Sequence, residues 1–311
     1  MARRPLHRVQ AASAARRYFI ARQTKSQIAE ELGISRFRVA RLIDAAIEEG
    51  IIQFVISEPG DLNTELGDAL RRSFGLKVAL VLEGRDLPTD AVTLPLGNLA
   101  AQYLDETLVE GQALGVSWGR TLAATAKALT HLPKVDVIQA AGSPAGLDFS
   151  QGPVELVHNM AGLSGGAAFP LYGPMWAEDP TLIERLRQEP SIAAAMARYD
   201  AIDVLMVGIG SWRPPQSGLY SGFPAEWRNE ALSLGVQADV CATLIDNQGL
   251  EVASRLQDYG LCITTKQLRR IPEVIGVGGG LEKADAIAAV LRGAWINVLI
   301  TDAGVARRLL Q

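Results

Sequence analysis

The sequence predicts an α/β protein in two parts, a small helical unit followed by a mostly parallel sheet covered by helices. Two observations support this prediction. In the first fifty residues, apolar side chains recur at helical spacing between capping residues. Further along the chain, short apolar runs alternate with helical stretches, which is typical of a parallel sheet. A chain of 311 residues has room for one small and one large domain.

The composition is globular, with 48% hydrophobic and 21% charged residues. The two cysteines, Cys241 and Cys262, give neither a disulfide framework nor a metal cluster, so we expect no metal and no cofactor. The basic start MARRPLHR leads into no apolar segment, and runs such as VLMVGIG are too short to cross a bilayer. We therefore expect a cytoplasmic protein without a membrane partner.

Charge is distributed unevenly along the chain. Residues 1–60 contain ten Lys/Arg and six Asp/Glu, a net charge of +4, whereas the whole chain carries −4, so the remainder carries −8. A basic end on an acidic body suits a module that meets a phosphate backbone. Ordinary surface charge explains these numbers equally well.

Three helices are predicted in the first fifty residues. The first covers residues 8–23, with an apolar stripe of Val9, Ala12, Ala15, Phe19 and Ile20. The second follows Thr24, which forms a capping-box pattern with Gln27, and ends at Gly33. The third runs over residues 36–49 after Ser35 as its cap. Residues 51–57 alternate as in a short strand, half of a possible wing.

A short helix, a turn containing glycine and a longer helix form the helix-turn-helix plan, in which the second helix enters the major groove of DNA. Its polar side here is rich in arginine. The alternative is a three-helix packing unit with a solvated basic face, which we consider less favoured than DNA binding. The predicted DNA-binding residues are Lys25, Ser26, Gln27, Ser35, Arg36, Arg38 and Arg41.

The linker is expected at residues 58–67, so the predicted domains are 1–57 and 58–311. The second domain begins with a helix over 65–75 and a strand over 76–84. Further predicted strands are 112–118, 135–142, 201–210, 274–280 and 295–302. The predicted helices that follow them are 121–132, 153–165, 181–200, 281–293 and 303–311.

Ligands in such sheets bind at the carboxyl ends of strands, where glycine-rich turns lead into helices, and three glycine-rich turns stand out in this sequence. The 115–121 loop (GVSWGRT) offers backbone N–H groups and hydroxyls at a helix N-terminus, although a tight structural turn is equally plausible. The turn of residues 276–283 places Lys283 beside three glycines, which favours an anion site. The loop of residues 162–170 forms either a pocket wall or a plain connector. Asp246 could accept sugar hydroxyls but is equally a turn former.

The sequence contains few patterns that are typical of catalysis. The histidines His7, His131 and His158 are scattered, and no metal-binding motif is present. The letters of residues 115–119 match a nucleophile elbow, yet the required Asp and His partners cannot be placed from the sequence. The tryptophans are too far apart for a nucleic-acid stacking platform.

Four segments of the sequence match a known family: residues 24–52 (TKSQIAEELGISRFRVARLIDAAIEEGII), LGVSWGRTLAATAKAL, ADVCATLIDNQG and residues 271–310. In these segments the chain resembles the SorC family of sugar-responsive transcriptional regulators. These segments occur in the family's order, and the match extends over essentially the whole chain. One departure is Ala238-Asp239-Val240, where the family often has Gly-Asp-Ile.

The resemblance implies a winged helix-turn-helix joined to an effector domain similar to sugar-phosphate isomerases. It also implies dimers or tetramers on palindromic operator DNA, with a phosphorylated sugar or polyol as effector. The 115–121 loop, the glycine turn and Lys283 would hold phosphate, and Asp246 would meet sugar hydroxyls. The predicted effector-binding residues are Gly115, Ser117, Trp118, Gly119, Arg120, Thr121, Gly142, Gly165, Gly166, Asp246, Gly278, Gly279, Gly280 and Lys283.

The predicted function is therefore that of a sequence-specific DNA-binding regulator of a carbohydrate or polyol operon, with repression relieved by the effector. The alternative is a sugar-phosphate isomerase or deaminase with a helical appendage. The helix-turn-helix and the lack of an evident acid/base constellation favour a regulator over an enzyme.

Overall fold

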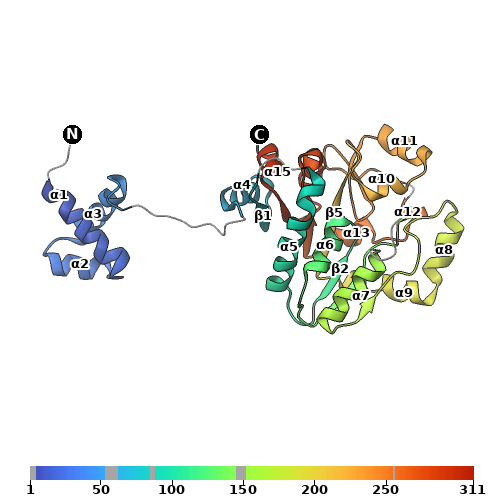
Figure 1. Ribbon diagram of the computed structural model, residues 1–311, viewed down its shortest axis with the longest axis horizontal. Coiled ribbons are helices and arrows are strands. Elements are labelled where there is room, and N and C mark those ends of the chain that lie inside the picture. The colour runs from blue at the N-terminus through green and yellow to red at the C-terminus, as the bar shows by residue number, and fades with distance from the viewer. Residues whose placement is uncertain (1–4, 53–61, 85–87, 145–151, 255) are drawn as a thin grey trace. The chain divides into compact units, whose positions relative to one another are not determined.

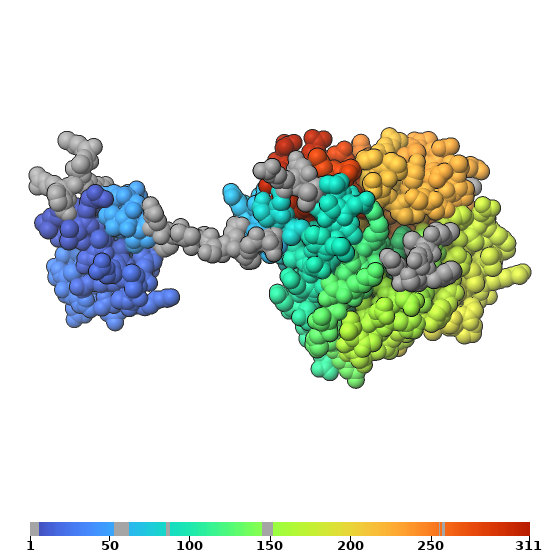
Figure 2. All heavy atoms as spheres, viewed as in Figure 1, coloured from blue at the N-terminus to red at the C-terminus, as the bar shows by residue number. Residues whose placement is uncertain are grey.

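In the computed structural model, which describes residues 5–52, 62–84, 88–144, 152–254 and 256–311, the chain divides into two units, 1–57 and 58–311 (Figure 1). The space-filling view shows that side chains pack each unit into a body of its own (Figure 2). None of the helices in the described ranges is both long and apolar enough to cross a membrane.

The N-terminal unit contains α1 (Pro5–Ala15), a π-helical turn (Arg16–Ile20), α2 (Lys25–Leu32) and α3 (Arg36–Glu48). Thr24 and Gln27 form the expected capping box, Gly33 ends α2 at a φ of 65°, and Ser35 accepts a hydrogen bond from the Arg38 N–H. The core consists of Ala11, Ala14, Ala15, Ile28, Val39, Leu42, Ile43 and Ala46. Two helices joined by a short glycine turn are consistent with a helix-turn-helix.

The predicted apolar stripe of the first helix is wrong at both ends, because Val9 and Ile20 are exposed. The small side chains of Ala11 and Ala14 face the core instead, which lets α1 pack closely against α3. The π-helical turn explains the shift at Ile20, since its wider turn changes which residues share a face. Residues 51 and 52 form a bend, and the rest of the predicted 51–57 strand lies outside the described residues.

The C-terminal unit is built on a mostly parallel sheet, which confirms the predicted fold class. Its strands are β1 (Val78–Leu82), β2 (Ala113–Val116), β3 (Asp136–Gln139), β4 (Ala168–Phe169), β5 (Val204–Ser211), β6 (Val236–Val240), β7 (Thr243–Asp246), β8 (Glu273–Val277) and β9 (Val298–Asp302). The spatial order is β1-β9-β8-β5-β2-β3-β4, with all neighbours parallel. Strands β6 and β7 form an antiparallel hairpin that pairs with the end of β5.

Helices cover both faces of this sheet. One face carries α5 (Thr89–Thr107), α6 (Arg120–Ala128) and α7 (Pro153–Ser164) (Figure 1). The other face carries α4 (Thr64–Phe74), α14 (Ala284–Arg292) and α15 (Ala303–Leu309). The remaining helices are α8 (Pro180–Gln188), α9 (Pro190–Met196), α10 (Gly218–Gly222), α11 (Ala225–Ser233), α12 (Leu256–Tyr259) and α13 (Thr265–Leu268). Strand β5 contributes side chains to the hydrophobic cores on both faces of the sheet, since Met206 packs in one core and Leu205 in the other.

Several helices differ from the sequence prediction, which contained no counterpart of α10, α11, α12 or α13. The predicted helix over 181–200 is broken into α8 and α9, because Pro190 begins a new helix and cannot continue the previous one. Helix α5 has no predicted counterpart, since Pro95 lies inside it and weakens the helical signal.

Candidate functional sites

A cavity of about 420 Å³ opens at the carboxyl ends of β2, β5 and β8. In the sheet, β3 and β4 lie on one side of β2, whereas the later strands β8 and β9 lie on the far side of β5. The direction in which strands are added along the chain therefore reverses between β2 and β5. Ligands in open α/β sheets bind at such a switch point. The polar lining side chains come from Thr89, Thr93, Ser117, Arg120, Thr121, Gln216, Ser217, Ser221, Asp239 and Lys283.

The 115–121 loop forms one wall of the cavity. Ser117 is buried directly after β2, and its N–H donates to the Met206 carbonyl of β5. Gly119 precedes α6 with a φ of 141°, which only glycine adopts readily, and no side chain caps this helix. The first backbone N–H groups of α6 lack partners within the helix and therefore suit an anion in the cavity.

Lys283 reaches the opposite wall from the start of α14. Its Nζ donates to the Ile209 carbonyl over 2.7 Å. Burial lowers the pKa of Lys283 to about 8, and the negative charge of Asp239 works against this decrease. A lysine with few water contacts and a free hydrogen-bonding capacity is a strong partner for an incoming anion.

Asp239 is the buried carboxylate beside this lysine. It accepts hydrogen bonds from Trp212 Nε1 over 2.8 Å and from Ser217 Oγ over 2.5 Å. Burial raises the pKa of Asp239, while these two donors and Lys283 lower it. Gly210 lies directly against this carboxylate, and a Cβ at that position would collide with it. The two donors therefore fix a polar group inside the cavity.

The rim of the cavity carries charge pairs. Arg120 forms an ion pair with Asp90 of α5, and its guanidinium lies 3.5 Å from Gln216 Oε1. Glu282 accepts from the N–H of Thr89 over 3.1 Å and from its hydroxyl over 2.9 Å, which lowers the pKa of Glu282. Glu282 thus occupies the N-terminus of α5, whereas the N-terminus of α6 carries no carboxylate cap.

The predicted effector residues divide into two groups. Ser117, Trp118, Gly119, Arg120, Thr121 and Lys283 line the cavity together. The glycine turn does not line it, because Gly279 packs against Asp302 and Leu96 and the Gly280 N–H donates to Asp302 Oδ2 over 2.7 Å. Gly278 contacts Ile209. These glycines allow close packing, so the turn serves the cavity only by positioning Lys283.

The other predicted glycines also have packing roles. A Cβ at Gly115 would collide with Leu205, and one at Gly142 with Pro174. Gly165 ends α7 at a φ of 70°, and Gly166 lies against the Val135 backbone. The lining of the cavity includes none of them.

Asp246 lies at the end of β7, away from the cavity lining. Its Oδ1 accepts from the N–H groups of Gln248 and Leu250, both over 2.9 Å. The carboxylate therefore closes its own turn, and we do not assign it to the site.

Sequence reasoning missed Asp239, Gln216, Ser217 and the α5 residues Thr89 and Thr93. The stretch ADVCATLIDNQG contains both Asp239 and Asp246. Asp239 lies between the apolar residues Ala238 and Val240, and an acid inside an apolar run was the signal that could have singled it out. Gln216 and Ser217 lie in a loop without a recognisable motif.

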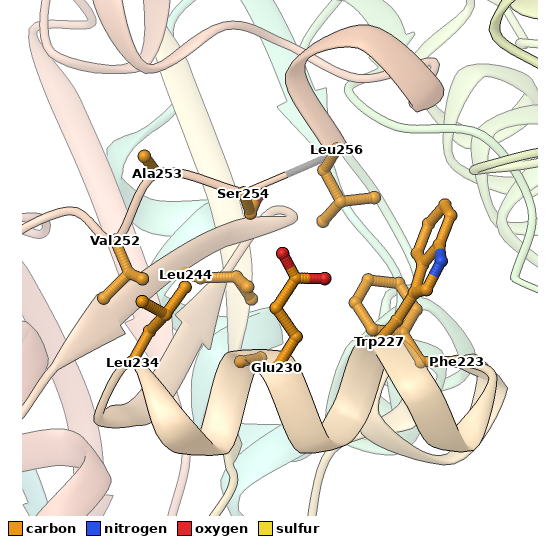
Figure 3. A pocket seen from close by; sticks show the side chains of 10 residues that line it. Phe223, Trp227, Glu230, Leu234, Leu244, Val252, Ala253, Ser254 and Leu256 are labelled. Carbon is orange, nitrogen blue, oxygen red and sulfur yellow. The ribbon is translucent and has the colours of Figure 1, made fainter.

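A second hollow lies between α11 and the segment that follows β7 (Figure 3). Its walls include Trp227 and Leu234, and the Glu230 carboxylate points across it. Its volume is about 20 Å³, which suffices for a water molecule but not for a sugar. It is therefore no alternative to the cavity at β2 and β5.

The predicted DNA-binding residues lie on one unit and are mostly exposed. Arg36, Arg38 and Arg41 project from the first two turns of α3, and within the described residues no ion pair joins them to an acid. Ser26 and Gln27 are exposed at the start of α2. Lys25 is half-buried and lies 5.6 Å from the Tyr18 ring centroid, and Ser35 is occupied as the cap of α3.

Comparison with known proteins identifies relatives along nearly the whole chain. Residues 60–311 match the family described as "Putative sugar-binding domain". The sorbitol operon regulator of Klebsiella pneumoniae is 28% identical, over 94% of this chain and 95% of that protein. The deoxyribonucleoside regulator of Bacillus subtilis is 27% identical, over 96% of both chains.

Solved structures agree with these sequence relatives. The full-length sorbitol operon regulator SorC of Klebsiella pneumoniae matches with a TM-score of 0.76 and 26% identity, over 98% of this chain and 99% of that one. A probable sor operon regulator from Shigella flexneri matches with a TM-score of 0.73 and 27% identity, over 80% of this chain and 100% of that one. These relatives are regulators and not sugar-phosphate enzymes. The chain therefore belongs to the sugar-binding-domain family of SorC-type transcriptional regulators.

Proposed function

We propose that the N-terminal unit binds duplex operator DNA through α3, and that the cavity of the C-terminal unit binds a phosphorylated sugar or polyol that controls this binding. The net charge of +4 in residues 1–60 supports the first part, because phosphate contacts supply much of the affinity for DNA. The arginines of α3 are available for such contacts or for guanine edges.

One observation carries the second part of the proposal. The uncapped N-terminus of α6 and the Nζ of Lys283 line the same cavity from opposite sides of the switch point. Oriented N–H groups and a buried ammonium together favour a phosphate. The Asp239 carboxylate and the Ser217 and Gln216 side chains then suit the hydroxyls of the attached sugar. A volume of about 420 Å³ falls within the size range of ligand pockets.

For the ligand to control DNA binding, it must bind one arrangement of subunits more tightly than another. We infer a homo-oligomer, a dimer or a tetramer, that places two α3 helices on half-sites one helical turn apart. Ligand binding then relieves repression of a carbohydrate or polyol operon, in the cytoplasm where the DNA lies. Light scattering with and without ligand measures the oligomeric state.

The experiment compares matched ligands. Purified full-length protein is screened by thermal shift against sugars and polyols, each with and without its phosphate group. A phosphorylated compound should raise the melting temperature, since a ligand selective for the folded form stabilises it, and should release bound DNA. Stabilisation by unphosphorylated sugars alone would refute the phosphate site. Turnover of any compound in the same panel would favour the enzyme alternative.

A further inference from the structure

Phe37 is the most exposed large apolar side chain in the part of the chain that the structure describes, with 81% of its surface open to solvent. It lies in the first turn of α3 between Arg36 and Arg38. The core of the unit is on the opposite face of this helix, which carries Val39 and Leu42. Because Phe37 stays in water, its ring contributes almost no burial to the stability of the fold.

The charges around Phe37 indicate what could cover it. Phe37 shares a helix face with Arg41, Asp44 and Glu48, which follow at intervals of three or four residues. The first two turns of this face are therefore cationic and the last turns acidic. These charges favour the approach of a polyanion to the end that holds Phe37. A second copy of this chain placed on Phe37 by a two-fold axis through that residue would bring the same arginines of the two copies against each other.

We propose that Phe37 reads DNA sequence by packing against the C5 methyl group of a thymine in the major groove. The thymine methyl is the apolar group that base pairs present there, and phenylalanine is among the side chains that contact it. The first residues of the second helix are those that reach base edges. This inference rests on the proposed function, because it requires α3 to enter the groove.

The test removes either partner of this contact. Full-length protein first selects operator sequences from a random duplex library. Each thymine of the best sequence is then replaced singly by deoxyuridine, which lacks only the methyl group, and Kd is measured by fluorescence anisotropy at one salt concentration. For one thymine in each half-site, the replacement should weaken wild-type binding about fourfold, as expected for one buried methyl-sized group. In Phe37→Ala, the same replacement should have no effect.

Two variants control for indirect effects. Ile20→Ala removes another exposed apolar side chain, 77% open to solvent, from the same unit and should retain the fourfold effect. Phe37→Leu keeps an apolar contact and should retain part of it. The proposal is wrong if no thymine shows an effect that depends on Phe37, or if Phe37→Ala changes the oligomeric mass. If the wild type selects no sequence at low salt, the proposed function itself fails.

Discussion

Effector affinity should fall as the pH rises from 7 to 9, because Lys283 loses its charge in this interval. With a pKa of about 8, roughly nine tenths of the Lys283 side chains are protonated at pH 7 and roughly one tenth at pH 9. A bound phosphate stabilises the protonated form of Lys283. At pH 9 most Lys283 side chains are neutral and must therefore take up a proton when the phosphate binds. Affinity should therefore fall about tenfold, or by about 1.4 kcal/mol.

The groups that face Lys283 define the control. Glu282 does not change its charge over this range, because its hydrogen bonds to Thr89 lower its pKa. A sugar phosphate is close to fully ionised above pH 7, since its second pKa is about 6. Asp239 has a raised pKa, and Lys283→Arg separates its contribution by keeping a permanent cation opposite the carboxylate.

Isothermal titration calorimetry at pH 7, 8 and 9 measures the effect, with the phosphorylated compound that gives the largest thermal shift. Lys283→Arg should bind with nearly constant affinity across this interval. Constant affinity in the wild type, or the same fall in Lys283→Arg, would show that Lys283 does not clamp the phosphate.

Three further substitutions test other parts of the structure. Arg38→Ala should weaken operator binding by about 1–3 kcal/mol and leave the effector-induced thermal shift unchanged, whereas Arg16→Ala, outside α3, should alter DNA affinity less. Gly210→Ala should lower the free energy of unfolding by about 1–3 kcal/mol in urea titrations, because the added methyl collides with the Asp239 carboxylate. Asp246→Ala should reduce stability by about 1 kcal/mol through the loss of its turn hydrogen bonds but retain full effector affinity; reduced affinity would restore Asp246 to the site.

Local signals predicted the N-terminal unit well. The hydrogen bonds that begin and end α2 and α3 join residues within three or four positions, so Thr24, Gly33 and Ser35 reveal them in the sequence. In the C-terminal unit, apolar runs predicted the six strands β1, β2, β3, β5, β8 and β9, whereas β4, the β6–β7 hairpin and the helices α10 to α13 were not predicted. Helix α5 was missed because Pro95 contradicts the local preference, and packing on the sheet overrides it.

The cavity was only partly predictable, because its residues come together from distant segments. The 115–121 loop and Lys283 follow strands directly, so the rule for parallel sheets places them at one edge. Asp239 meets Lys283 only because the hairpin folds back on β5, a pairing that no local pattern indicates. The glycines at 278–280 were interpreted as an anion loop, since a sequence does not distinguish room for a ligand from room for a neighbouring side chain.

The double pairing of β5 has an evolutionary consequence. Residues 204–208 pair with the parallel strand β8, and 204–206 of them also with β2, whereas 209–211 pair with β6, which supplies Asp239. If the proposed site is correct, substitutions in the hairpin can alter which hydroxyl pattern is preferred without disturbing the strands that carry the proposed phosphate-binding end. A scaffold with this layout can be retuned from one metabolite to another by exchanging a single short segment.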